Sequence, residues 1–203
     1  MNKKEQQAID FLRSMERDDP MCLGFSGGKD SVVILDLAER SGIKYNASYA
    51  NTTVDPPGTI SFIKKNYSQV QILHPKKSFF QLVESKGLPG RMRRFCCEKL
   101  KEQYGIGQRT IEGMRAEESQ SRALYEPEQC DVRKWMKGAK HILPILTGQK
   151  LMFGTISENM DFHILNITMH LTIFPVMVVL VVLSQDASRC RRNLRYFPAM
   201  LVE

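Results

Sequence analysis

The segment around residue 27 constrains the fold of this chain more than any other. A short apolar run, Met21 to Phe25, is followed by SGGKDS at residues 26–31 and then by VVILDLAER. This order predicts a buried strand, a tight glycine turn and a helix. Glycines allow close backbone approach, the helix start offers free N–H groups, and Lys29 adds a mobile cation, so we expect a phosphate cradle. The pattern is neither the kinase-type P-loop nor the dinucleotide fingerprint.

Strand and helix patterns alternate along the first 146 residues. Further strands are expected at 44–50, 69–75, 109–115 and 141–146, helices at 3–17, 59–67 and 78–85, and a loop entering a helix at 116–125. Alternation of this kind is typical of a parallel sheet with helices on both faces. The expected fold class is therefore α/β, a Rossmann-like three-layer parallel sheet over residues 1–146, followed by an irregular C-terminal tail, 147–203.

The charge balance favours anionic partners. Lys and Arg number 29 against 22 Asp and Glu, a formal net charge of +7, which suits nucleotides, sulfate esters or nucleic acid. The first residues are charged and amphipathic without an apolar signal-peptide core, so a cytoplasmic, reducing compartment is expected. The five cysteines are then expected as thiols or as metal or cluster ligands, not as structural disulfides.

Four ordered blocks resemble a known family. SGGKDS is similar to the signature of the PP-loop ATP pyrophosphatase superfamily. RFCCEKLK at 94–101 resembles the R-x-C-C-x-x-x-K block of the phosphoadenosine phosphosulfate (PAPS) reductase family within it, and GMRAEESQSR at 113–122 resembles that family's G-x-R-x-x-E-S-x-x-R block. Pro144-Ile145 matches the strand before the family's last helical part. The resemblance spans roughly residues 21–146.

The resemblance implies an enzyme of sulfur metabolism that binds an adenine nucleotide, PAPS, APS or ATP, across the carboxyl ends of the sheet. Mg²⁺ would accompany ATP, and a thioredoxin-like reductant or a sulfur donor would be a partner. Arg94 and Lys99 are weaker candidates for anion contacts. The residues that the resemblance assigns to nucleotide binding are Ser26, Gly27, Gly28, Lys29, Asp30, Ser31, Gly113, Arg115 and Arg122.

The cysteine pattern departs from the family. In its cluster-bearing branch a Cys-Cys pair and a later C-x-x-C ligate an iron–sulfur cluster, so the resemblance implies Cys96 and Cys97 as ligands. This sequence contains no C-x-x-C; Cys130 and Cys190 are the cysteines left to complete a set of four. The alternative is a pair of buried or reactive free thiols. The E-C-G-L-H motif that carries the reductases' nucleophile is absent, so no catalytic residue is assigned.

The last 57 residues, 147–203, change in character. Ile164 to Leu183 carries no formal charge, but polar residues and a proline interrupt it, so we do not expect a membrane span. Back-translation of residues 151–164 in a shifted frame permits DVWDYIREYGFPY, which is similar to the family's sequence at this place. We therefore hypothesise that about residues 148–186 come from a shifted reading frame.

Several functions stay open from the sequence. One is sulfonucleotide reduction or sulfur transfer. A second is ATP-dependent adenylation, as in DNA phosphorothioation or tRNA thiolation. A third is a non-catalytic nucleotide- or nucleic-acid-binding module, suggested by the net charge and by the basic runs RMRR and KWMKGAK. A product with a shifted tail could also lack activity.

Overall fold

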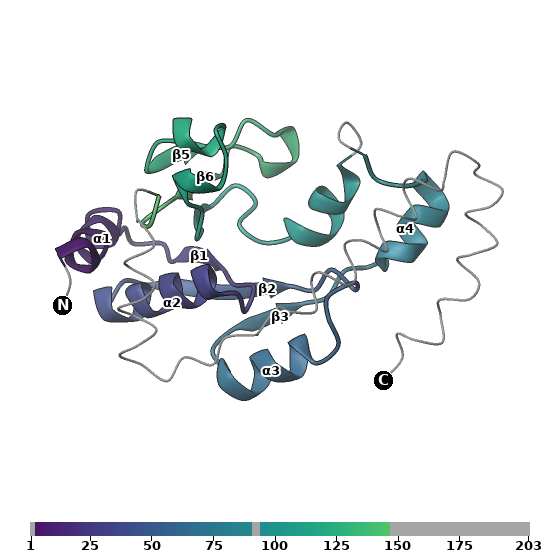
Figure 1. Cartoon of the computed structure of the whole chain (residues 1–203), viewed down its shortest axis with the longest axis horizontal. Coiled ribbons are helices and arrows are strands. Elements are labelled where there is room, and N and C mark those ends of the chain that lie inside the picture. Colours follow the sequence, from purple (N-terminus) through teal and green to yellow (C-terminus); the bar gives the residue numbers. More distant parts are fainter. Residues whose placement is uncertain (1–2, 91–93, 147–203) are drawn as a thin grey trace.

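The computed structural model describes residues 3–90 and 94–146 (Figure 1). The expectations for residues 147–203, including the charge-free run and the shifted reading frame, lie outside the described residues. No described helix is long and apolar enough to cross a membrane.

The described residues build a six-stranded sheet in the order β3-β2-β1-β4-β6-β5. All neighbouring strands are parallel except β5, which runs antiparallel to β6. The expected α/β, Rossmann-like fold is confirmed. The strands are β1 (Met21–Gly24), β2 (Tyr45–Ala50), β3 (Gln71–Leu73), β4 (Arg109–Ile111), β5 (Glu128–Cys130) and β6 (Lys140–Ile142).

Within the described residues, α1 precedes β1, and three further α-helices and four shorter helical turns lie between the strands. Figure 1 shows α2 and α3 on one side of the strands and α4 at the end of the molecule opposite α1. The α-helices are α1 (Lys3–Ser14), α2 (Lys29–Ser41), α3 (Thr59–Asn66) and α4 (Phe79–Lys86). The short turns are the π-helix η1 (Cys97–Lys101) and the 3-10 helices η2 (Ala116–Glu118), η3 (Arg122–Leu124) and η4 (Lys134–Met136).

Local sequence signals explain where the principal helices begin and end. At α2, Gly42 adopts the left-handed conformation, φ 73°, and its N–H donates to the carbonyl oxygen of Glu39, which is a common helix ending. At α4, Ser78 and Gln81 form a reciprocal capping box, which satisfies two of the donors at the helix start. These caps fix where α2 ends and where α4 begins.

Two hydrophobic clusters hold the layers together. The larger joins α1 and α2 to one face of the sheet, with Leu12, Leu23, Ile34, Ile111 and Ile142 all fully buried. The smaller packs α4 against the cysteine-bearing segment through Phe79, Leu82, Val83, Phe95 and Leu100. Each such side chain contributes about 1.5–3 kcal/mol on burial, so both clusters fix the ends of the loops that reach the sheet's carboxyl edge.

Local expectations differ from the structure in several places. The strand expected over 109–115 ends at Ile111, and the strand expected over 69–75 spans only Gln71–Leu73. The expected helix within residues 116–125 is two 3-10 turns, η2 and η3. The strand expected over 141–146 ends at Ile142, and Pro144 two residues later lacks the N–H that a central strand must donate. The edge strand β5 was not expected, because Glu-Gln-Cys is short and has low strand propensity.

Candidate anion-binding site

The candidate site lies beside β1, where the strand order changes direction across the sheet. From β1 the chain moves through α2 to β2 on one side, whereas β4 pairs with β1 on the other side. In open α/β sheets ligands bind at this switch point, outside the carboxyl ends of the strands. Residues 26–31 follow β1 and residues 113–122 follow β4. The topology therefore brings the two motif blocks to one edge.

The loop at residues 26–31 turns sharply and leads into the first turn of α2. Gly27 has φ 75°, a conformation that suits glycine. Ser31 Oγ donates to the carbonyl oxygen of Gly28 at 2.7 Å, and Ser26 Oγ donates to Ser31 Oγ at 3.2 Å. The cap residue Gly28 makes no side-chain hydrogen bond to the start of this 13-residue helix, and a helix start of this kind favours an anion. Lys29 is exposed at this helix start.

Gly113 and Arg115 join the second block to the first. A Cβ on Gly113 would lie 3.0 Å from the carbonyl carbon and oxygen of Asp30, so any larger residue would force this backbone contact to shift. Arg115 Nε forms an ion pair with Asp30 Oδ1 at 3.2 Å, and the Arg115 residue is only 9% exposed. Burial raises the pKa of Asp30, and the Arg115 charge opposes that rise most strongly. The pair fixes a guanidinium beside the start of α2.

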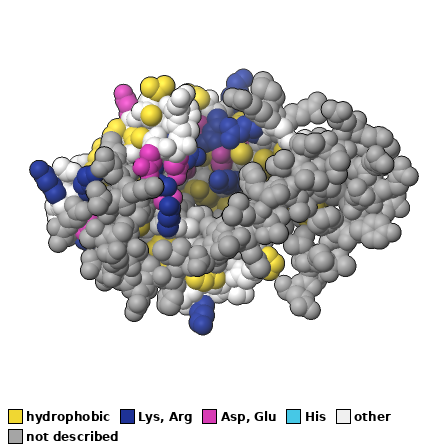
Figure 2. Space-filling view, in the orientation of Figure 1, with side chains coloured by type: hydrophobic (Ala, Val, Ile, Leu, Met, Phe, Trp, Pro, Cys, Tyr) yellow, Lys and Arg dark blue, Asp and Glu magenta, His cyan; other side chains and the backbone are white. Residues whose placement is uncertain are grey.

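Further carboxylates surround the arginines of this block. Arg115 also pairs with Glu117 and with Glu118, the latter at 3.6 Å. Arg122 pairs with Glu118. These carboxylates hold the guanidinium groups in place, and a bound oxyanion would compete with them for the same N–H donors. Figure 2 shows lysine and arginine side chains gathered next to acidic ones near the middle of the visible face.

A neighbouring loop follows β2 at the same edge of the sheet. Thr53 adopts φ 64°, and its Oγ1 accepts a hydrogen bond from the Phe79 N–H at the start of α4. Thr52 N–H donates to Asp55 Oδ2 at 2.9 Å. Asn51 Nδ2 lies 3.3 Å from Nδ1 of His74, which follows β3. The loop therefore connects the carboxyl ends of β2 and β3 with the start of α4.

The weaker anion candidates contact their own segment. Arg94 donates to Cys97 Sγ at 3.7 Å, and Lys99 pairs with Glu98. Their role in anion binding stays a prediction. The same holds for the roles of residues 26–31, Arg115 and Arg122.

The cysteines do not form a complete metal site in the described ranges. Cys96 and Cys97 are partly buried, and burial, together with the Cys97 thiol, raises the pKa of Cys96. Cys130 is exposed on β5, and no group of three His, Cys, Asp or Glu among the described residues could hold a metal ion. Cys190 lies outside these residues. Two adjacent thiols alone do not fit an iron–sulfur cluster, which needs four ligands. The described residues therefore assign no chemistry to a cluster.

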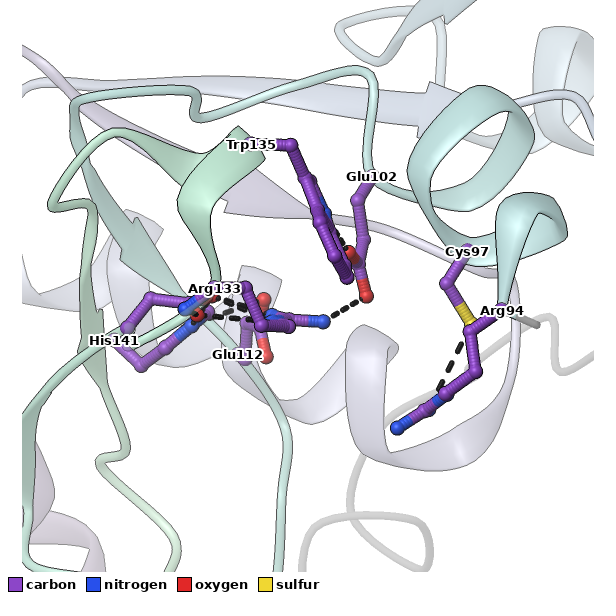
Figure 3. A network of polar contacts seen from close by, with 8 residues as sticks. Arg94, Cys97, Glu102, Glu112, Arg133, Trp135 and His141 are labelled. Carbon is purple, nitrogen blue, oxygen red and sulfur yellow. Dashed lines mark hydrogen bonds and ion pairs between the residues drawn. The ribbon is translucent and has the colours of Figure 1, made fainter. Parts of the chain in front are cut away.

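A polar network on the β5–β6 side was missed from the sequence (Figure 3). It joins residues that are up to 39 positions apart, and although Glu102, Glu112 and Trp135 lie in or beside segments that the sequence singled out, nothing in the sequence showed that they meet. Its members are Glu102, Glu112, Asp131, Arg133, Trp135 and His141.

Comparison with known proteins agrees with this arrangement. Residues 20–159 match the family described as phosphoadenosine phosphosulfate reductase domain. An uncharacterised protein of Methanocaldococcus jannaschii is 33% identical over 108 residues, which is 48% of this chain and only 26% of that protein.

Solved structures share the fold. They include PAPS reductase from Candida auris in a phosphate complex (TM-score 0.55, 16% identity, 75% of this chain and 79% of that one). NH3-dependent NAD synthetase from Campylobacter jejuni (0.54, 15%, 80% and 75%) and the U34-tRNA thiolase NcsA from Methanococcus maripaludis with its [4Fe-4S] cluster (0.51, 16%, 79% and 66%) are also similar. Because the family match covers more than half of the sequence, the chain belongs to the phosphoadenosine phosphosulfate reductase domain family.

Proposed function

We propose that this chain binds an adenine nucleotide at the carboxyl ends of β1 and β4 and acts on it in sulfur chemistry. The observation that carries the proposal is the ion pair between Arg115 and Asp30, 3.2 Å long, which makes one site from two distant motif blocks. A buried guanidinium beside an uncapped helix start is an arrangement that favours oxyanions.

Each part of the site has a separate task in this proposal. The N–H groups at the start of α2 and the Lys29 ammonium hold the phosphate or sulfate oxygens. Arg115 and Arg122 exchange their carboxylate partners, Glu117 and Glu118, for oxygens of the nucleotide, where the fork of a guanidinium can bind two oxygens at once. The loop at residues 51–55 contacts the nucleoside. Negative charge that develops on the leaving group is thereby stabilised.

The reaction that we favour is reductive cleavage of a sulfonucleotide or transfer of its sulfur. A thiolate attacks the sulfur, the bond from sulfur to the phosphate oxygen breaks, the nucleotide leaves with that oxygen, and a second thiol releases sulfite from the S-sulfonate. A thioredoxin-like protein would supply the electrons in a reducing, cytoplasmic setting.

A second candidate is ATP-dependent adenylation coupled to sulfur insertion, with tRNA or DNA as acceptor. It is favoured by the absence of E-C-G-L-H from the sequence and by the shared fold with the tRNA thiolase. Here the PP-loop would hold the leaving pyrophosphate, and Mg²⁺ would enter with the nucleotide phosphates.

Isothermal titration of the full chain with ATP–Mg²⁺ and, separately, with PAPS tests the proposal. We expect saturable binding of at least one nucleotide, weakened about tenfold or more by Lys29→Ala through loss of a charged contact. Lys64→Ala, which removes an exposed charge on α3, is the matched control and should bind normally. Preference for PAPS supports sulfonucleotide reduction, and preference for ATP supports adenylation.

Two results would overturn the proposal. One is the absence of binding to either nucleotide. The other is binding of DNA that is independent of nucleotide and falls steeply with salt, together with unchanged nucleotide affinity in Lys29→Ala, which would favour the nucleic-acid-binding module. Iron and sulfide analysis of anaerobically purified full chain decides separately whether Cys96 and Cys97 hold a cluster.

A further inference from the structure

A polar network ties the cysteine-bearing turn to the β5–β6 hairpin (Figure 3). Its first member, Glu102, directly follows η1, and the Glu102 N–H donates to the carbonyl oxygen of Cys97 at 2.8 Å. Whatever fixes Glu102 therefore fixes the end of the turn that presents Cys97.

The hairpin holds both carboxylate oxygens of Glu102. Oε1 pairs with the Arg133 guanidinium, and Oε2 accepts a hydrogen bond from Trp135 Nε1 at 2.7 Å. The Arg133 guanidinium also lies 5.6 Å from the centre of the Trp135 ring. The Glu102 side chain is only 16% exposed. A shielded carboxylate bound at both oxygens has little freedom to turn.

The same Arg133 continues the network toward the anion-binding site. Its Nε donates to both oxygens of Asp131 at 2.9 and 3.0 Å, and His141 Nε2 lies 2.8 Å from Asp131 Oδ2. The other ring nitrogen of His141 forms an ion pair with Glu112 at 3.2 Å. Glu112 immediately precedes Gly113 in the block that carries Arg115.

The stability of the hairpin alone does not account for this network. Desolvating several charges costs free energy that apolar packing would avoid, so shielded ion pairs are weak evidence for stability alone. Arg133 is shared between Glu102 on one side and Asp131 on the other, so a shift of either carboxylate changes its contacts with the other. This sharing connects the thiol segment to the strands that carry the anion site.

We propose that Arg133 is a positioning residue that, through Glu102, orients the Cys97 turn relative to Arg115 and so couples anion binding to thiol reactivity. The coupling rests on the proposed function, whereas the positioning does not. When an oxyanion replaces the carboxylates at Arg115, the change reaches Cys97 through Glu112, His141, Asp131, Arg133 and Glu102.

The test measures the rate at which iodoacetamide alkylates Cys97 in the full chain, reduced and free of metal, with and without ATP–Mg²⁺ or PAPS. Mass spectrometry assigns the modified residue. The test variant is Arg133→Met. The matched control is Arg40→Met, because Arg40 also pairs with two carboxylates, Glu5 at 3.2 Å and Asp36 at 3.1 Å, and has the same 28% exposed side chain.

We expect Arg133→Met to raise the unliganded Cys97 rate about three- to tenfold and to abolish the effect of nucleotide on that rate, a range set by typical coupling energies. Arg40→Met should leave both within about twofold of wild type even where it lowers thermal stability, because its ion pairs lie within α2 and between α1 and α2, away from this path. Arg133→Lys, which keeps the charge but not the fork, should be intermediate. If Arg133→Met does not fold, Trp135→Phe, which removes one donor to Glu102, should shift the rate in the same direction.

Equal Cys97 rates in Arg133→Met and Arg40→Met would overturn the positioning role. Nucleotide binding that leaves the wild-type rate unchanged would overturn the coupling. If calorimetry detects no nucleotide binding but the rate still rises in Arg133→Met alone, the proposed function fails while the positioning role is supported.

Discussion

Gly113 approaches the backbone of Asp30 so closely that an added Cβ would stand 3.0 Å from the Asp30 carbonyl carbon and oxygen. The first residue of the second motif block therefore touches the first turn of α2. The glycine serves close approach rather than an unusual backbone angle, and the Arg115–Asp30 ion pair lies just beyond it. The contact sets the distance between the buried guanidinium and the helix start.

Gly113→Ala should weaken nucleotide binding about tenfold and destabilise the fold by about 1–3 kcal/mol, because the added methyl group pushes against backbone that cannot rotate away. Calorimetry and thermal unfolding measure the two effects. Gly90→Ala is the control, since a Cβ at Gly90 meets nothing within 4 Å and should change neither quantity. Unchanged affinity in Gly113→Ala would show that this close approach does not shape the site.

The strand, glycine turn and helix of residues 21–41 could be predicted because local signals agree there. An apolar strand of four residues, two glycines and an amphipathic helix leave few alternatives. The parallel order of the first strands followed from the alternation of elements. Family resemblance placed the second block near the first. The pairing of Arg115 with Asp30, 85 positions away, could not be predicted from the sequence and is seen only in the folded structure.

The rest of the structure depends on contacts that have no local sequence signal. Strand β5 is specified by its pairing with β6, because the sequence Glu-Gln-Cys by itself predicts a polar loop. Trp135 lies in the basic run KWMKGAK, which suggested a nucleic-acid-binding module, and Arg133 directly precedes that run, yet both side chains bind Glu102. His141 looked like one residue of a strand and instead lies between two carboxylates. Periodicity reports which face is buried and cannot report which charges meet there.

Arg115→Met should reduce nucleotide affinity by at least about tenfold, because it removes a charged donor and leaves Asp30 partly buried without its partner. Arg115→Lys should recover only part of the affinity, since an ammonium cannot bind two oxygens in the plane of a guanidinium. Titration calorimetry measures the affinities, with Arg40→Met as the control for loss of a shielded arginine elsewhere. Full affinity in Arg115→Lys would argue against a forked contact.

The Cys96 thiol should alkylate more slowly near pH 8 than an exposed cysteine does. Burial and the neighbouring Cys97 raise the pKa of Cys96, so less of the reactive thiolate is present at a given pH. Cys97→Ser removes the second cause and should move the pH profile of Cys96 alkylation to lower pH, while burial keeps its pKa raised. Mass-spectrometric rates between pH 7 and 10 measure the shift. A profile that stays in place would mean that burial alone sets the reactivity.

His141 should make the stability of the chain fall in mildly alkaline solution. The Glu112 carboxylate, with a smaller contribution from Asp131, raises the pKa of His141 from 6.5 to about 9 in the folded protein. The stabilisation is therefore fully present below about pH 6.5, the unfolded value, and is lost as the pH rises through about 9, to a total of as much as about 3 kcal/mol. Denaturant unfolding at pH 6, 7.5 and 9 measures this slope. His141→Gln, which cannot titrate, should lose most of the slope, and Glu112→Gln should move it to lower pH. A slope that persists in His141→Gln would assign it to another group.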